Sequence, residues 1–79
     1  MPGQPSPLSQ RKYEIAQQIR KARREKGRTQ EQAALFLGCS RKRYNSLEQG
    51  LTELRATELA RLAEALNVPL TFFFERSES

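Results

Sequence analysis

The side chains best equipped for chemistry in this sequence are basic, and they are concentrated in its first fifty positions. Residues 1–50 carry eleven Lys or Arg and four Glu, a net charge of +7, whereas residues 51–79 carry three basic and five acidic side chains, a net charge of −2. A basic half joined to a mildly acidic half fits a molecule with one face on a polyanion and another face in a second role. A cationic surface that is merely solvated is the alternative explanation of the charge alone.

Other kinds of chemistry lack the residues that they need. The sequence has no His and a single Cys, Cys39, so an intrachain disulfide, a zinc site and His-based catalysis are all excluded. We therefore expect no enzyme, no metal and no cofactor. Because no apolar run approaches about 20 residues and no signal peptide is visible, we expect a cytoplasmic protein without membrane association.

The basic residues need elements to position them, and the sequence predicts an all-α fold, a compact five-helix bundle without strands. Apolar residues recur at helical spacing between start and stop signals such as Ser9, Gly27, Ser40 and Gly50. The predicted helices cover residues 10–26, 29–37, 40–49, 56–66 and 69–74. The bundle forms one domain over residues 11–74, between a flexible, proline-rich N-terminal arm (1–10) and a polar C-terminal tail (75–79).

The second and third predicted helices form a helix-turn-helix. Thr29 to Gln32 fits a capping box, and only Gly38, Cys39 and the cap residue Ser40 lie between the two helices, which leaves room for a tight turn alone. Tyr44 and Leu47 direct the third helix toward the core. We expect the Tyr44 hydroxyl to reach solvent or a hydrogen-bond partner.

With Thr29-Gln30-Glu31, Leu47-Glu48-Gln49-Gly50 and the segment 62–70 in place, residues 13–74 resemble the phage repressor and Cro-like, xenobiotic-response-element type of helix-turn-helix domain, the lambda-repressor-like fold. The resemblance implies that the helix over 40–49 enters the major groove of DNA. It also implies contacts to base edges from Arg41, Lys42, Asn45 and Ser46. Contacts to phosphates are implied for Thr29, Gln30 and Arg43. Arg and Lys suit guanine O6 and N7, and Asn suits adenine N6 and N7.

Two groups of residues lie outside this motif. The first is a basic face of the first helix, which either touches the DNA backbone or is solvated: Arg20, Lys21, Arg23 and Arg24. The second is apolar. The resemblance implies core packing for Leu70, Phe73 and Phe74, whereas Leu54, Val68 and Phe72 are expected to form an exposed patch. Such a patch favours a homodimer, which would place two recognition helices about 34 Å apart on a palindromic operator.

The function that this implies is sequence-specific binding of double-stranded DNA by a transcriptional regulator, a repressor that works as a homodimer. Small chains of this kind resemble phage repressors, restriction-modification controllers and antitoxins, so a bacterial or phage-type, nucleoid-associated protein is expected. The alternative is an antitoxin or adaptor whose acidic, aromatic C-terminal half binds a partner protein such as a toxin, with DNA binding for autoregulation.

Overall fold

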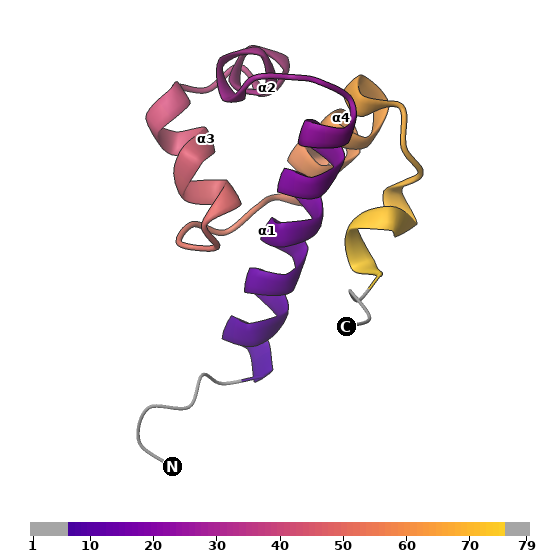
Figure 1. The fold of residues 1–79 in the computed structure, drawn as a ribbon. Coiled ribbons are helices and arrows are strands. Elements are labelled where there is room, and N and C mark those ends of the chain that lie inside the picture. The colour runs from indigo at the N-terminus through magenta and orange to yellow at the C-terminus, as the bar shows by residue number, and fades with distance from the viewer. Residues whose placement is uncertain (1–6, 76–79) are drawn as a thin grey trace.

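The helix signals of the sequence are realised in a computed structural model that describes residues 7–75. No strand occurs among these residues, which confirms the all-α class. The fifth element is a 3-10 helix rather than an α-helix, so the count of five α-helices was one too many. In chain order the elements are α1 (Pro7–Glu25), α2 (Gln30–Leu37), α3 (Arg41–Glu48), α4 (Ala56–Leu66) and η1 (Leu70–Phe74) (Figure 1).

The start of α1 differs from the prediction. The helix begins at Pro7 instead of Gln10, so Ser9 lies inside it and is not its N-cap. Proline suits a first helical turn, because its missing N–H has no intrahelical partner there and its φ is already helical. Residues 7–10 are thus helical and not part of an arm. The rest of the predicted arm (1–6) and the end of the predicted tail (76–79) lie outside the described residues.

The helix-turn-helix is built by the caps that the sequence predicts. The Thr29 hydroxyl accepts a hydrogen bond from the Gln32 backbone N–H at 3.1 Å, and the Thr29 N–H donates to Gln32 Oε1 at 2.9 Å, which completes the capping box. Gly38 ends α2 in the left-handed conformation, with φ of 71°. The Ser40 hydroxyl then caps α3 by accepting from the Arg43 N–H at 3.1 Å. These local bonds fix where α3 starts and in which direction it leaves the turn.

The core lies where α1 is surrounded by the other elements. In Figure 1, α1 runs through the middle of the molecule, with α3 on one side and η1 on the other. The largest side chains that are fully buried include Ile19 of α1, Tyr44 and Leu47 of α3, and Phe73 of η1. No helix among residues 7–75 has the length and apolar character needed to cross a bilayer.

The C-terminal aromatic residues pack differently from the prediction. Phe73 is fully buried as expected, but Leu70 and Phe74 remain 44% and 42% exposed. Phe72 is half-buried: it packs against the core, lies edge-to-face with Phe73, and its carbonyl accepts a hydrogen bond from Gln18 of α1. Because a 3-10 helix has about three residues per turn, a segment of five residues places few side chains fully against the core. Within η1, the exposed apolar residues are Leu70 and Phe74.

Leu54 and Val68 are also less exposed than predicted. Both are half-buried and pack against the core cluster, so with Phe72 they do not form a freely exposed patch.

Candidate nucleic-acid interface

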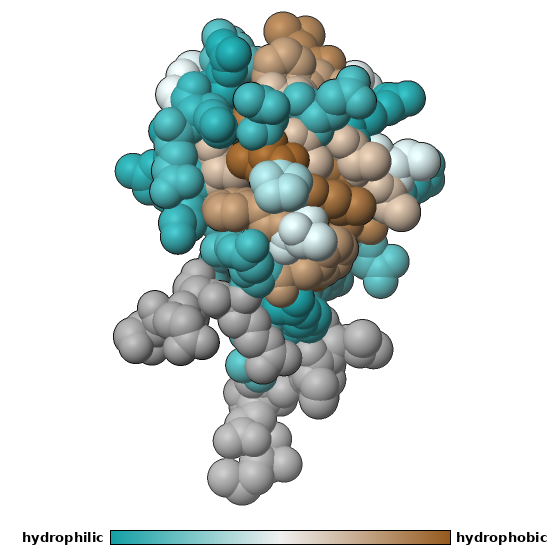
Figure 2. Space-filling view, turned by 90° about the vertical axis from the view of Figure 1, so that its right-hand side faces the viewer, coloured by the Kyte–Doolittle hydropathy of each residue, from teal (hydrophilic) through white to brown (hydrophobic). Residues whose placement is uncertain are grey.

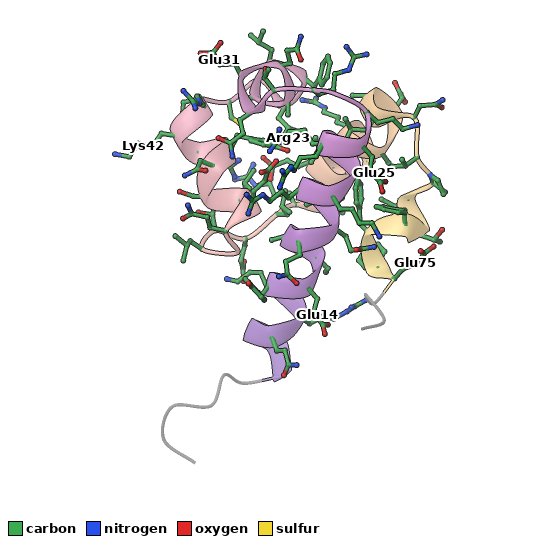
Figure 3. All side chains as sticks on the ribbon, in the orientation of Figure 1. Glu14, Arg23, Glu25, Glu31, Lys42 and Glu75 are labelled. Carbon is green, nitrogen blue, oxygen red and sulfur yellow. The ribbon has the colours of Figure 1, made fainter. Side chains whose placement is uncertain are left out.

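The first turn of α3 presents two unpaired cations. Arg41 and Lys42 are both exposed, and neither forms an ion pair with any residue of the described range 7–75. Lys42 points away from the rest of the molecule (Figure 3). Because Ser40 caps the helix directly before them, these two side chains stand at the start of a rigid element, with their charged groups available to an anion outside the protein.

Gln30 and Asn45, predicted to contact phosphate and base, are brought together by the structure. Gln30 is the first residue of α2, and its Nε2 donates to Asn45 Oδ1 at 3.0 Å and to Glu48 Oε1 at 3.2 Å. An amide nitrogen carries two N–H groups, so both of those on Gln30 are engaged inside the protein. The side-chain donor expected for a phosphate is therefore directed at α3.

Arg43 turns away from the other predicted contacts. Its guanidinium bonds the Glu58 carboxylate of α4 at 2.7 and 3.5 Å, and Glu58 also accepts the Arg55 N–H at 3.0 Å. The Arg43 side chain is 35% exposed, so this pair lies in reach of solvent and of a competing anion. The hydrogen bond to Glu58 raises the pKa of Arg43, which is charged at any pH of interest.

The two hydroxyl residues of the predicted site have different surroundings. Ser46 is half-buried, and its hydroxyl donates to the Lys42 carbonyl at 3.3 Å, back onto its own helix. Thr29 is exposed, and its hydroxyl oxygen accepts the capping bond from Gln32 while its own hydrogen stays available. Thr29 is thus better placed than Ser46 to donate to an anion.

A buried ion pair behind this surface was missed by the sequence reasoning. Arg23, predicted to lie on a basic face, instead points between α1 and α3 (Figure 3), where its Nε lies 2.6 Å from Glu48 Oε2 and its Nη2 3.2 Å from Oε1. Its Nη1 donates to the Arg28 carbonyl at 2.7 Å. A signal was available, since Arg23 lies four residues after Ile19 and Glu48 four after Tyr44, which places both on apolar stripes.

Electrostatics keep this pair charged. Burial alone would raise the pKa of Glu48, but the hydrogen bond from Arg23, with smaller effects of the nearby Tyr44 hydroxyl and the Gln30 amide, lowers it. Burial, reinforced by Glu48, raises the pKa of Tyr44 far above its ordinary value. The Tyr44 oxygen is buried beside the pair, so the expectation that it reaches solvent was wrong. It lies against Glu48 and Arg23 without standard hydrogen-bond geometry to any described residue.

Among residues 7–75, no three His, Cys, Asp or Glu side chains gather into a group that could hold a metal ion. Cys39 is half-buried and packs against the core cluster.

Comparisons with known proteins bear on the fold. The profile of the helix-turn-helix family matches residues 19–73. Among solved structures, the chain is similar to the restriction-modification controller protein C.AhdI from Aeromonas hydrophila, with 27% sequence identity, a TM-score of 0.73, and coverage of 78% of this chain and 94% of the controller chain. The comparison with curated protein sequences found no match.

Proposed function

Since the chain belongs to the helix-turn-helix family of DNA-binding regulators, we propose that it represses transcription by binding a palindromic operator as a homodimer. The observation that carries this proposal is the exposed, unpaired basic end of α3, formed by Arg41 and Lys42. Arginine and lysine at the start of a recognition helix meet the O6 and N7 acceptors of guanine in the major groove. The similarity to a controller protein supports regulation rather than architecture as the role.

Phosphate contacts position the helix in this proposal. Thr29 and the start of α2 hold one phosphate, and Arg43 reaches a second only by exchanging Glu58 for it. Such an exchange costs little where an ion pair is within reach of solvent, because a pair of this kind contributes little stability by itself. Ser46 adds a base contact only if its hydroxyl leaves the Lys42 carbonyl.

Titration of a DNA duplex with the protein tests the proposal. A duplex selected from a random library should bind with an affinity that falls steeply as salt rises, because each phosphate neutralised by a cation releases counterions. Arg41→Ala should cost about 1–3 kcal/mol at one base pair and leave other positions unchanged. Arg61→Ala, an exposed cation on α4, is the matched control and should leave discrimination intact. A flat salt response would remove DNA binding altogether.

The homodimer is proposed on the face that carries η1. Figure 2, which looks at the side on which η1 lies in Figure 1, shows apolar surface between polar edges. Leu70 and Phe74 supply exposed apolar area there, and the half-buried Leu54, Val68 and Phe72 are proposed to line the same interface.

Sedimentation at micromolar concentration should show a dimer that Phe74→Glu dissociates. A monomer that Phe74→Glu leaves unchanged would contradict the dimer. A stoichiometric complex with another protein, lost in the same variant, would favour the alternative of an antitoxin or adaptor. The exposed Leu70 and Phe74 are compatible with that alternative too.

A further inference from the structure

We propose that a chain of hydrogen bonds from the buried Arg23–Glu48 pair through Gln30 fixes the amide orientation of Asn45, so that Asn45 offers N–H donors to DNA and selects a keto base, guanine first. The proposal rests on the proposed function, because it specifies what the same helix reads. It replaces the expectation that Asn45 bonds adenine through both amide atoms.

Glu48 can only accept hydrogen bonds. Arg23 holds both carboxylate oxygens, at 2.6 and 3.2 Å, and the Glu48 side chain is 2% exposed. A guanidinium that donates to both oxygens keeps the carboxylate ionised, and an ionised carboxylate has no hydrogen to donate. Any group that approaches Glu48 within hydrogen-bond distance must therefore present a donor.

Gln30 is the group that approaches. The atom of its amide that lies 3.2 Å from Glu48 Oε1 must be the nitrogen, since the oxygen would face another acceptor. The second N–H of that nitrogen reaches Asn45 at 3.0 Å. Because Glu48 fixes the orientation of the Gln30 amide, Gln30 presents an N–H donor, and not its oxygen, to Asn45.

Asn45 in turn must direct its carbonyl oxygen at Gln30. Its two Nδ2 hydrogens are then left for the outer surface of α3, where Arg41 and Lys42 also carry donors alone. A flipped Asn45 amide would place its NH2 group against the NH2 group of Gln30 and lose the hydrogen bond between them. The loss of one such bond disfavours the flipped state by roughly fivefold.

A surface that offers only donors discriminates among the four bases. In the major groove guanine presents two acceptors and thymine one, whereas adenine presents an acceptor and a donor and cytosine a donor. The guanine edge therefore suits the outward Nδ2 group of Asn45 best. Paired recognition of adenine needs Oδ1 on the outside, where Gln30 does not allow it to be.

The test begins by locating the base pair that Asn45 reads. With the full chain and a duplex selected from a random library, this is the pair whose discrimination disappears in Asn45→Ala. At that pair the unmodified protein should bind guanine or thymine at least roughly fivefold more tightly than adenine or cytosine.

Two further variants probe the orientation itself. Asn45→Asp still accepts from Gln30 but presents an oxygen outward, so the order of the bases should reverse in favour of cytosine and adenine, whatever its overall loss of affinity. Gln30→Met keeps a side chain of similar size but removes the hydrogen bonds to Asn45 and Glu48. The affinity for adenine relative to guanine at the Asn45 pair should then rise, while discrimination at the pair read by Arg41 stays unchanged. Thermal unfolding followed by circular dichroism verifies that both variants are folded.

Several outcomes would overturn the proposal. The first is an adenine preference at the Asn45 pair that Gln30→Met leaves unaltered. The second is an order of base preference that Asn45→Asp does not reverse. The third is a Gln30→Met variant that binds all four bases at this pair more weakly by the same factor, as a merely structural role would. The proposal would also be overturned if Asn45→Ala kept its discrimination at every base pair. By contrast, the absence of salt-dependent binding to any duplex would refute the proposed function itself.

Discussion

The substitution Glu48→Gln keeps the size of the side chain, removes its charge and leaves the Arg23 guanidinium beside a neutral partner. The two side chains are 12% and 2% exposed, for Arg23 and Glu48 in that order, so water compensates little for the lost charge. Removing one partner of a buried pair costs about 3–5 kcal/mol. Arg23 keeps its bond to the Arg28 carbonyl, so the lower end, about 3 kcal/mol, is the value expected for Glu48→Gln.

Thermal unfolding at pH 7 measures this cost. For a domain of this size 1 kcal/mol corresponds to about 4–8 °C in Tm, so Glu48→Gln should lower Tm by about 12–24 °C. The matched control is Glu58→Gln, which breaks the more exposed pair with Arg43 and should cost less than about 1 kcal/mol. If Glu48→Gln lowers Tm no more than the control does, the buried pair between α1 and α3 does not stabilise the fold.

The pH dependence of Tm tests the same ion pair in a second way. Although burial alone would raise the pKa of Glu48, the hydrogen bonds led by Arg23 lower it below the unfolded value of about 4.3. A carboxylate whose folded pKa is lowered contributes its full stability above the unfolded pKa and loses it as the pH falls through the folded pKa. The gap in Tm between the unmodified protein and Glu48→Gln should therefore narrow below about pH 4. A gap of constant size down to pH 2 would contradict this assignment.

Three further predictions concern the caps, the turns and the exposed ion pair. Thr29→Ala removes the capping hydroxyl of α2 and should cost about 0.5–2 kcal/mol in chemical denaturation. Gly50→Ala should destabilise more than Gly27→Ala: both have positive φ, at 75° and 69°, but only at position 50 does a Cβ meet α1 backbone, at 3.2 Å. Equal losses would mean that the contact is relieved without cost. Glu58→Gln removes the anion that competes with a phosphate for Arg43, so the affinity for any duplex should rise at a given salt concentration; an unchanged affinity would show that Arg43 stays off the backbone.

Local signals in the sequence predicted most of the fold. The capping box at Thr29 and the cap at Ser40 act over three residues, and Gly38 needs only its own backbone to adopt a positive φ. Interactions of such short range are written in consecutive residues, which is why α2, α3 and α4 lie where they were expected. The start of α1 was misplaced, because a proline is tolerated in a first turn and Ser9 offered a competing cap.

The burial of the C-terminal aromatics depended on geometry that periodicity alone does not provide. Leu70 and Phe74 were expected inside because the family resemblance implied a short helix that closes the core, and the 3-10 form changed which side chains face the core. The burial of Phe73 and the half-burial of Phe72 are set by where η1 meets α1, which is a distance between segments far apart in the chain.

The candidate DNA interface divides in the same way. The start of a basic helix after Ser40, with Arg41 and Lys42 on its surface, could be predicted from the sequence, because helix caps and charge act locally. Which cations are unpaired, and which partners each amide meets, could not be predicted, because both depend on tertiary packing. Arg23 and its partner Glu48 are 25 residues apart, and Gln30 and Asn45 are 15 apart. The partner of a charge or an amide is chosen by the packing of helices, and that packing also selects which atoms are left to face the DNA.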